Sequence, residues 1–543
     1  MESKIKSKIA TIKDFLYQNT IYIPKYQRSY SWQKENVYTF IDDLMNNECY
    51  YLGNILIEKR DETEIIDGQQ RIITSTLVLA AIKNLKNIDD FSFDKTLLYE
   101  NNKPRINIED RANDTTLKIM DYIFDDIDIT MELKKSNEFA QYVNIKNKLK
   151  DYDKDCILKL YNNLLACQLL IIDSGDYSIT PYQMFLNLNT KGLRLSNMDI
   201  VKSYIFDLLS KENDFPTIKN NWYSISNQIT EKNYDEYLST YADIKLSTKK
   251  QKIVKKEISR IYSDAIASSK NNALNIYRDI GEPTSNYYTS YYSVVFNKSD
   301  SYVQQFNDTS VDLQAVFNYF SFIKKISFSQ FNVTFISMLF YDNNTSKKYI
   351  RKNINYIINF IQFIFLFAAL NSLKNVSPST YGNKFVSFSS DLYKDKKNIK
   401  MYISKIVNNF VVREYIIDDL SAFDQKVFEQ NNKELKIAVA LIAYLDGDSI
   451  CNYNGEHFKP NSLNDEDSKS FGNIIPVVND IYKDKDEVAK IKMYQENKNS
   501  EIHIDAFLKN DCTEDGKCNI NERTERYKKL FLEKFNSLFK FLK

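Results

Sequence analysis

Glycine and proline are scarce throughout this chain, and their scarcity limits the folds that it can adopt. The 543 residues include only 10 Gly and 8 Pro. A large β-sandwich or barrel needs many tight turns, and such turns depend on these two residue types. The composition therefore favours a predominantly helical α+β protein in which strands occupy a small part.

Length and charge indicate several packed domains without a global nucleic-acid signature. A chain of 543 residues is too long for one hydrophobic core and suggests roughly three domains. A hydrophobic content of 43% supports packed cores and excludes a disordered chain. Because 73 Lys and Arg balance 72 Asp and Glu, any surface that binds nucleic acid must be a local patch.

Cysteine usage and hydropathy favour a cytoplasmic protein that does not enter a membrane. The close pair Cys512 and Cys518 has no CxxC spacing and no histidine after it, so we expect reduced thiols and no zinc site. No secretory segment opens the chain. The most apolar run, Tyr356–Leu370, is short for a membrane span and carries Asn359 and Gln362. It predicts a buried core helix.

Hydrophobic periodicity predicts mixed strands and helices near the N-terminus. Two amphipathic helices are expected at Lys6–Asn19 and Lys34–Asn46, and a strand at Tyr50–Glu58. A second strand, Glu64–Arg71, is expected to run into a loop before a strongly apolar, buried helix at Ile72–Leu85.

The middle of the chain is predicted to be a long succession of helices. A loop and then a helix are expected within Phe185–Leu209, with Ser196 as N-cap and Asp199 as its partner in a capping-box-like arrangement. Helical patterns then continue from about 210 to 445. The basic run Thr248–Lys256 could bind DNA phosphates, but a solvated helix face is the favoured interpretation.

One cluster of charged and polar residues, the first constellation, lies in the second predicted strand and the residues after it. Asp67, Gly68 and Arg71 would arrive together at the N-terminus of a buried helix, with the amides of Gln69 and Gln70 beside them. Helix N-termini attract anions, glycine admits close approach of a ligand, and arginine grips phosphate bidentately. The pattern predicts a phosphate site. The alternative is an ordinary Asp-Gly turn with an arginine salt bridge.

An aromatic segment precedes this constellation in the chain. Tyr26, Gln27 and Arg28 stand in a non-helical stretch that ends at Trp32, after Pro24. Aromatic faces combined with a guanidinium suit a base or nucleotide. The alternative is the edge of a hydrophobic core with a paired arginine.

Four blocks in this order resemble the N-terminal domain of the GmrSD-type modification-dependent endonucleases. They are IPKYQRSYSW, YYLGNILIE, EIIDGQQRIITSTLVLAAI and FLNLNTKGLRLSNMDIVKSYIF. That domain is similar to ParB and sulfiredoxin folds, and in relatives the DGQQR motif serves nucleotide binding and hydrolysis. The chain has no P-loop motif, so an NTPase activity would not use that machinery.

The resemblance implies a set of nucleotide-site residues. Asp67 and Arg71 would be catalytic as well as binding. A second loop would contribute Asn189 and Gly192. The full implied set is Tyr26, Gln27, Arg28, Asp67, Gly68, Gln69, Gln70, Arg71, Asn189 and Gly192.

A second constellation lies near the C-terminus, where the only two histidines of the chain occur. His457 stands in Glu-His-x-x-Pro, and Gly472-Asn473 and Asn479 follow it. A neutral histidine can take a proton from attacking water, and one divalent ion can stabilise charge on the phosphate. The alternative is a structural or surface histidine. His503 lies outside the pattern and is expected to be structural or exposed.

This second pattern resembles the HNH-type (ββα-metal) nuclease domain of the same family. The resemblance implies His457 as general base, Asn473 as the residue that ties the loop, and Asn479 as the third HNH position. Glu456 and Asn479 would ligate Mg²⁺ or Mn²⁺. The spacing between Asn473 and Asn479 is shorter than is usual in the family, and Pro476 replaces an apolar residue. A degenerate domain is therefore the alternative.

Together these patterns predict three regions. They are a ParB/sulfiredoxin-like α/β domain at 1–210, a helical region at 211–400 and an HNH-like domain at 401–543. The resulting hypothesis is an NTP-regulated, modification-dependent DNA endonuclease in anti-phage defence. The alternative is an NTPase or DNA-binding defence component whose HNH domain does not cleave and acts with a partner.

The resemblance also implies ligands and partners. The nucleotide would be GTP, UTP or ATP, which the sequence does not distinguish. The partner would be DNA, in particular modified phage DNA. A homodimer is a further option, because relatives are often dimeric.

Overall fold

The computed structural model divides into two compact units. Unit 1 comprises Met1–Asp235 and Tyr262–Pro283, and unit 2 comprises Glu236–Ile261 and Thr284–Lys543. The predicted ranges 1–210, 211–400 and 401–543 stay a prediction. The structure describes residues 6–23, 27, 30–59, 62–85, 93–108, 120, 123, 136–174, 180–189, 196–246, 252–267, 269–296, 311–340, 345–377, 379–395, 398–413, 420–424, 433–448, 453–459, 470–478, 487–497, 502–513 and 517–543.

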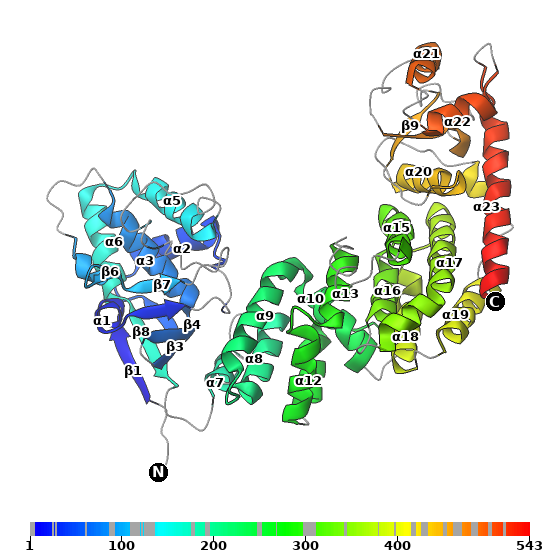
Figure 1. Ribbon diagram of the computed structural model, residues 1–543. Helices are drawn as coiled ribbons and strands as arrows, with labels where there is room; N and C mark the ends of the chain where they lie inside the picture. The colour runs from blue at the N-terminus through cyan, green and yellow to red at the C-terminus, as the bar shows by residue number, and fades with distance from the viewer. Residues whose placement is uncertain are drawn as a thin grey trace. The chain divides into compact units, whose positions relative to one another are not determined.

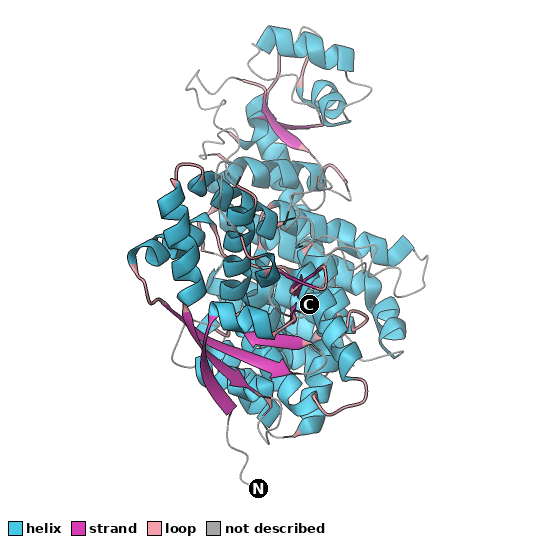
Figure 2. Ribbon diagram, turned by 90° about the vertical axis from the view of Figure 1, so that its left-hand side faces the viewer, coloured by secondary structure: helices cyan, strands magenta, loops and turns pink. Residues whose placement is uncertain are grey.

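Unit 1 is built on a mixed sheet, seen in magenta in Figure 2. Among the described residues, six strands pair in the order β1-β8-β3-β4-β2-β7. Both the β1–β8 and β3–β4 pairs are antiparallel, whereas β8–β3, β4–β2 and β2–β7 are parallel. The strands are β1 (Lys6–Thr11), β2 (Ile21–Ile23), β3 (Tyr51–Lys59), β4 (Thr63–Asp67), β7 (Ile106–Ile108) and β8 (Gln168–Asp173).

Helices pack on both faces of this sheet. One face packs on a large apolar core that includes α3, and the other packs on a smaller cluster that includes Met184 of α7. The helices of unit 1 are α1 (Ile12–Gln18), α2 (Lys34–Asn46), α3 (Gln69–Lys83), α5 (Asn137–Leu149), α6 (Lys154–Ala166), α7 (Pro181–Asn189), α8 (Asn197–Leu209), α9 (Phe215–Ile229) and α12 (Lys270–Ile280).

Unit 2 is helical apart from one small hairpin in its described part. Its two strands are β9 (Asn454–His457) and β10 (Ile474–Val477). The long helix α23, red in Figure 1, packs against α17, α19, α20 and α22. The helices are α13 (Asn286–Val295), α15 (Val311–Lys325), α16 (Asn332–Leu339), α17 (Thr345–Leu373), α18 (Ser379–Lys394), α19 (Ile399–Arg413), α20 (Lys433–Leu445), α21 (Glu487–Asn497), α22 (Ile502–Asp511) and α23 (Ile520–Leu542). Two further helices, α10 (Tyr234–Tyr241) and α11 (Ile258–Ala267), contain residues of both units.

The predicted mainly helical α+β class is confirmed, as are several local elements. Helix α2 has the predicted bounds, and β3 lies one residue from its predicted position. The Ser196 hydroxyl accepts a hydrogen bond from the Asp199 amide, and it donates to the Asp199 carboxylate over 2.6 Å. Helix α17 contains an apolar window long enough to cross a membrane, but 83% of that window is buried, which confirms the predicted core helix.

Two local predictions in unit 1 are wrong. The predicted helix Lys6–Asn19 is strand β1 followed by α1, because Lys6–Thr11 pairs with β8 and Thr11 then caps the new helix. The loop expected within Phe185–Leu209 is partly helical, since α7 runs to Asn189.

The expectation of reduced thiols at Cys512 and Cys518 is also wrong. The two residues form a disulfide. They face each other in an isolated antiparallel bridge between the end of α22 and the start of α23. The bridge brings the two side chains together, which the sequence spacing did not reveal.

A buried charge network joins α20, α22 and α23. His503 of α22 is buried, and its ring nitrogens lie 2.9 Å from Asp446 and 2.8 Å from Asp448. The hydroxyl of Tyr527 donates to the same Asp446 over 2.9 Å. Burial alone would lower the pKa of His503, but the hydrogen bonds and charges of the two carboxylates outweigh burial and raise it. His503 is therefore structural, one of its two predicted roles.

We predict that unit 2 loses stability as pH rises through the folded-state pKa of His503. Because that pKa is raised, the contribution is complete below the unfolded value of about 6.5 and disappears at higher pH. Hydrogen exchange of α22 and α23 should quicken from pH 6 to pH 9 after correction for intrinsic rates. His503→Gln should quicken exchange at pH 6 and weaken this pH dependence. An unchanged pH dependence in the variant would contradict the prediction.

Candidate functional site

The DGQQR motif forms a direct strand-to-helix junction in unit 1. Asp67 is the last residue of β4, Gly68 is the N-cap, and α3 begins at Gln69. The predicted loop after the strand is therefore absent, and Arg71 lies in the first turn of the helix. As the sequence predicted, a buried strand delivers the motif to the N-terminus of a buried helix.

Gly68 is required at this junction for two reasons. Its φ is 94°, a left-handed conformation that disfavours residues with a side chain. A Cβ there would also overlap the Ile55 side chain and lie 3.2 Å from the Asn54 carbonyl oxygen. The first turn of α3 closes on Gly68, whose carbonyl accepts from the Arg71 and Ile72 amides. The glycine thus permits both the sharp turn and the close packing on β3.

Arg71 is anchored on β3, in a contact that the sequence did not predict. Its Nη1 donates to the Leu52 carbonyl over 2.9 Å. The same nitrogen lies against Gly53, and a Cβ at this position would overlap the nitrogen. The φ of Gly53 is 108°. The β3–β8 register shifts at this point. A glycine inside the strand block YYLGNILIE is the signal that could have indicated such a close approach.

The segment that ends the aromatic block lies on the first turns of α3. The Ser31 amide donates to Gln70 Oε1 over 2.7 Å, and the hydroxyls of Tyr30 and Thr74 lie 2.7 Å apart. The side-chain amide of Asn137, in α5, donates to the carbonyls of Tyr30 and Trp32. Residues 30–32 therefore lie beside the first turns of α3, whereas the predicted position of Tyr26, Gln27 and Arg28 near DGQQR stays a prediction. Asn137 was missed because it lies far away in the sequence.

The structure describes some of the remaining predicted nucleotide-site residues and not others. Gln27 and Gln69 are buried. Tyr26, Arg28 and Gly192 lie outside the described residues. Asn189 ends α7, but the position of its side chain is not described. The second loop of the predicted site therefore stays a prediction.

A buried acid precedes the motif on the same strand. Glu64 lies on β4 with 6% of its surface exposed. Burial raises its pKa, and the charge of Lys219 in α9, 3.9 Å away, opposes that shift. Strand alternation places Glu64 on the sheet face opposite Asp67. This acid is therefore not part of the DGQQR surface.

The second constellation forms the only hairpin among the described residues of unit 2. β9 and β10 are antiparallel, with His457 opposite Ile474 and Glu456 opposite Ile475. The acid–His dipeptide therefore lies on a β-hairpin. Asn479 lies outside the described residues, so the third HNH position stays a prediction.

Asn473 ties the two strands of this hairpin together. Its Oδ1 accepts from the Lys459 amide over 2.6 Å, and its Nδ2 donates to the Lys459 carbonyl over 3.0 Å. Its own carbonyl accepts from the Phe458 amide. Asn473 thus links the segment after β9 to the segment before β10, and its role in a nuclease site stays a prediction.

Helix α23 fixes the Gly-Asn end of the pattern. A Cβ at Gly472 would overlap the Ile520 carbonyl, and the Gly472 amide donates to Thr524 over 2.9 Å. The buried Arg523 donates to the carbonyls of Gly472 and Ile474 over 2.5 and 2.7 Å. Arg523 and Thr524 were not predicted, because they lie about 50 residues further along the chain.

Glu456, the predicted metal ligand, is held by a lysine. Lys490 of α21 places its Nζ 2.5 Å from Glu456 Oε1 and also donates to the His457 carbonyl. Both side chains are buried, at 4% and 6% exposure. Among the described residues, no group of three His, Cys, Asp or Glu side chains is placed to hold a metal ion. Of the two implied metal ligands the structure describes Glu456, and its contact with the Lys490 ammonium does not suit a divalent ion at that carboxylate.

His457 is buried on the hairpin face that α20 covers. Its exposure is 4%. Gly455 packs on Leu435 and Val439 of α20, and strand alternation places His457 on the same face as Gly455. Glu456 lies on the opposite face, with Lys490. The adjacent acid and histidine of the pattern therefore do not converge on one point.

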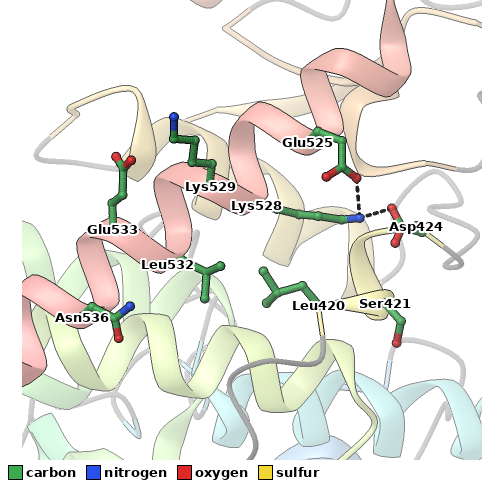
Figure 3. A pocket seen from close by; sticks show the side chains of 9 residues that line it. All are labelled: Leu420, Ser421, Asp424, Glu525, Lys528, Lys529, Leu532, Glu533 and Asn536. Carbon is green, nitrogen blue, oxygen red and sulfur yellow. Dashed lines mark hydrogen bonds and ion pairs between the residues drawn. The ribbon is translucent and has the colours of Figure 1, made fainter.

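Unit 2 also contains a cavity of about 580 Å³ between residues 420–424 and α23 (Figure 3). Its charged side chains include Lys528, which lies 2.5 Å from Asp424 and 2.7 Å from Glu525. Neither predicted constellation contributes to it. The lining residues are Leu420, Ser421, Asp424, Glu525, Lys528, Lys529, Leu532, Glu533 and Asn536.

Comparison with known proteins supports the N-terminal resemblance. Residues 12–206 match the model of the family described as the GmrSD restriction endonuclease, N-terminal domain. No curated protein matches the chain. The match contains the DGQQR junction and α7, whereas the C-terminal hairpin lies beyond it. It indicates a defence function of the restriction-endonuclease type, and hence DNA as a partner. The HNH resemblance stays a prediction.

We predict that Gly68→Ala destabilises unit 1 by about 2 kcal/mol or more. The variant combines a left-handed alanine with overlap at Ile55. Thermal unfolding followed by circular dichroism measures the effect. The control is Gly382→Ala in α18, where a Cβ would meet nothing within 4 Å, so it should be neutral or stabilising. Equal stability of Gly68→Ala and wild type would contradict the assigned junction geometry.

Proposed function

We propose that this chain is a nucleotide-regulated DNA restriction protein whose nucleoside triphosphate site is the β4–α3 junction. The observation that carries the proposal is the placement of Asp67, Gly68 and Arg71 at the N-terminus of α3, inside the matched range 12–206. The match supplies the link to restriction. The junction supplies chemistry suited to a phosphate.

The junction would hold phosphate by three physical means. The N-terminus of a helix carries partial positive charge and attracts a phosphate. Gly68 presents no side chain, so a phosphate oxygen can approach the backbone there. Arg71 has five N–H donors, of which the hydrogen bond to Leu52 uses one. A carboxylate at Asp67 would orient water at the bound phosphate.

Residues 30–32 would contribute to the base or ribose side of this site. Tyr30 and Ser31 are tied to Thr74 and Gln70 on α3, so this segment and the helix N-terminus form one rigid arrangement. Trp32 packs edge-on against Phe40, which fixes its ring. GTP, UTP and ATP all remain candidates. Binding would license the action of the chain on modified phage DNA.

Under this proposal the C-terminal hairpin would cut DNA, with His457 as general base. A second candidate is favoured by the contact between Glu456 and Lys490, which uses the predicted metal ligand internally. In that case the hairpin domain binds DNA or a partner protein, and the chain itself does not cleave. The nucleotide site is common to both candidates.

We predict that Asp67→Ala and Arg71→Ala weaken or abolish nucleotide-dependent activity. Loss of a charged contact to phosphate should weaken binding about tenfold or more, and loss of Asp67 should remove hydrolysis. Calorimetric titration with each NTP and measurement of phosphate release test this. The control is Asp155→Ala, which removes an exposed acid of α6 in the same unit. Unchanged hydrolysis by Asp67→Ala would contradict the phosphate-site assignment.

We predict that His457→Ala abolishes DNA cleavage while the chain stays folded. Modified and unmodified phage DNA would be incubated with wild type and variant, with Mg²⁺ or Mn²⁺, with and without NTP. Cutting by wild type alone supports the nuclease candidate. Cutting by both proteins would contradict the role of His457. No cutting by wild type under any condition favours the second candidate. A circular dichroism melt of the variant separates lost chemistry from lost folding.

A further inference from the structure

The acid of the His-x-x-Pro hairpin already holds a cation supplied by the chain itself. We propose that the Lys490 ammonium is the built-in cation of this hairpin, so that Glu456 binds Lys490 and not a divalent metal ion. The inference deepens the second candidate function and does not depend on the nucleotide site in unit 1.

The geometry around Lys490 is that of a compact cation site. The ammonium lies 2.5 Å from Glu456 Oε1 and also donates to the backbone carbonyl of His457. A carboxylate and a backbone carbonyl are two oxygen donors that a hard divalent ion uses. Lys490 therefore occupies one carboxylate oxygen and the backbone carbonyl beside it, the position that a metal ion would take at this corner of the hairpin.

Burial makes this pairing obligatory. The side chains of Lys490 and Glu456 are 4% and 6% exposed. A buried charge is very costly without an opposite charge and hydrogen bonds, so neither side chain is tolerated here without the other. A metal ion at Glu456 would displace the ammonium and leave it buried beside a second positive charge. The ion pair thus excludes the metal on electrostatic grounds as well as by occupancy.

The other residues of the pattern have structural positions of their own. His457 lies on the opposite face of β9, towards α20, because it alternates with Glu456. The Asn473 amide is engaged with both main-chain groups of Lys459. These three side chains therefore do not form a shared donor set. Lys490 joins the hairpin to α21, and Asn473 joins its two strands.

The test measures hydrogen exchange of the β9 and β10 peptides in the full chain, stripped with chelator and free of nucleotide. Exchange is compared without metal, with Mg²⁺ and with Mn²⁺. The variants are Lys490→Met, Glu456→Gln and the two combined. Lys492→Met is the control, because Lys492 is an exposed lysine on the same helix.

We expect metal to leave exchange in the wild-type hairpin unchanged. Lys490→Met and Glu456→Gln should each quicken it at least about tenfold, because each leaves one buried charge without its partner. The combined variant should destabilise the hairpin, as measured from its exchange rates, by less than the sum of the two single effects. The control should match wild type. Slowed exchange with Mg²⁺ or Mn²⁺ that Glu456→Gln abolishes would overturn the proposal. Additive effects in the combined variant would also overturn it.

These outcomes are separate from those of the proposed nucleotide site. Nucleotide titration reports on unit 1 at Asp67 and Arg71, whereas hairpin exchange reports on unit 2. If the chain binds NTP and metal slows exchange of its hairpin, the proposed role of Lys490 is refuted and the nucleotide site is not. If the chain does not bind NTP and metal leaves exchange of the hairpin unchanged, the nucleotide proposal is refuted and the role of Lys490 is not.

Discussion

The left-handed backbone at Gly68 is the constraint on which the candidate nucleotide site depends. It allows β4 to pass into α3 without a connecting loop, so that Asp67 and Arg71 stand on either side of the helix N-terminus. The close approach of β3 to this turn follows from the missing Cβ. Gly53 in the neighbouring strand β3 also lacks a Cβ, and this leaves room for the guanidinium of Arg71. Two glycines thus set the positions of the charged groups.

The two constellations use different physical means to position polar groups. In unit 1, backbone conformation and main-chain contacts fix the motif on a buried strand and helix. In unit 2, buried charges hold the hairpin: Lys490 binds Glu456, and Arg523 binds the carbonyls before and within β10. The first arrangement presents a helix terminus suited to a ligand. The second satisfies its charged groups within the chain, which supports the proposed role of Lys490 as the cation of the hairpin.

Local patterns could be predicted from the sequence, and non-local pairing could not. Helix α2 and the cap at Ser196 depend on residues within a few positions, and both are observed as predicted. Strand β1 looked helical because its partner, β8, is far along the chain. The contact between Lys490 and Glu456 joins residues 34 positions apart, and the Cys512–Cys518 disulfide depends on how α22 meets α23. No periodicity reports such contacts. The DGQQR block was informative because its residues are consecutive and their geometry is local.

Hydrogen exchange of the whole chain with and without non-hydrolysable GTP, UTP and ATP analogues tests the central claim most directly. If the β4–α3 junction is the nucleotide site, one of these analogues slows exchange at the amides of the first turn of α3 and at residues 30–32. Exchange of the β9 and β10 amides in unit 2 is the internal reference, because it reports changes that do not come from direct contact with the nucleotide. Binding that protects other segments and leaves residues 67–72 unchanged would contradict the account, as would no binding of any of the three.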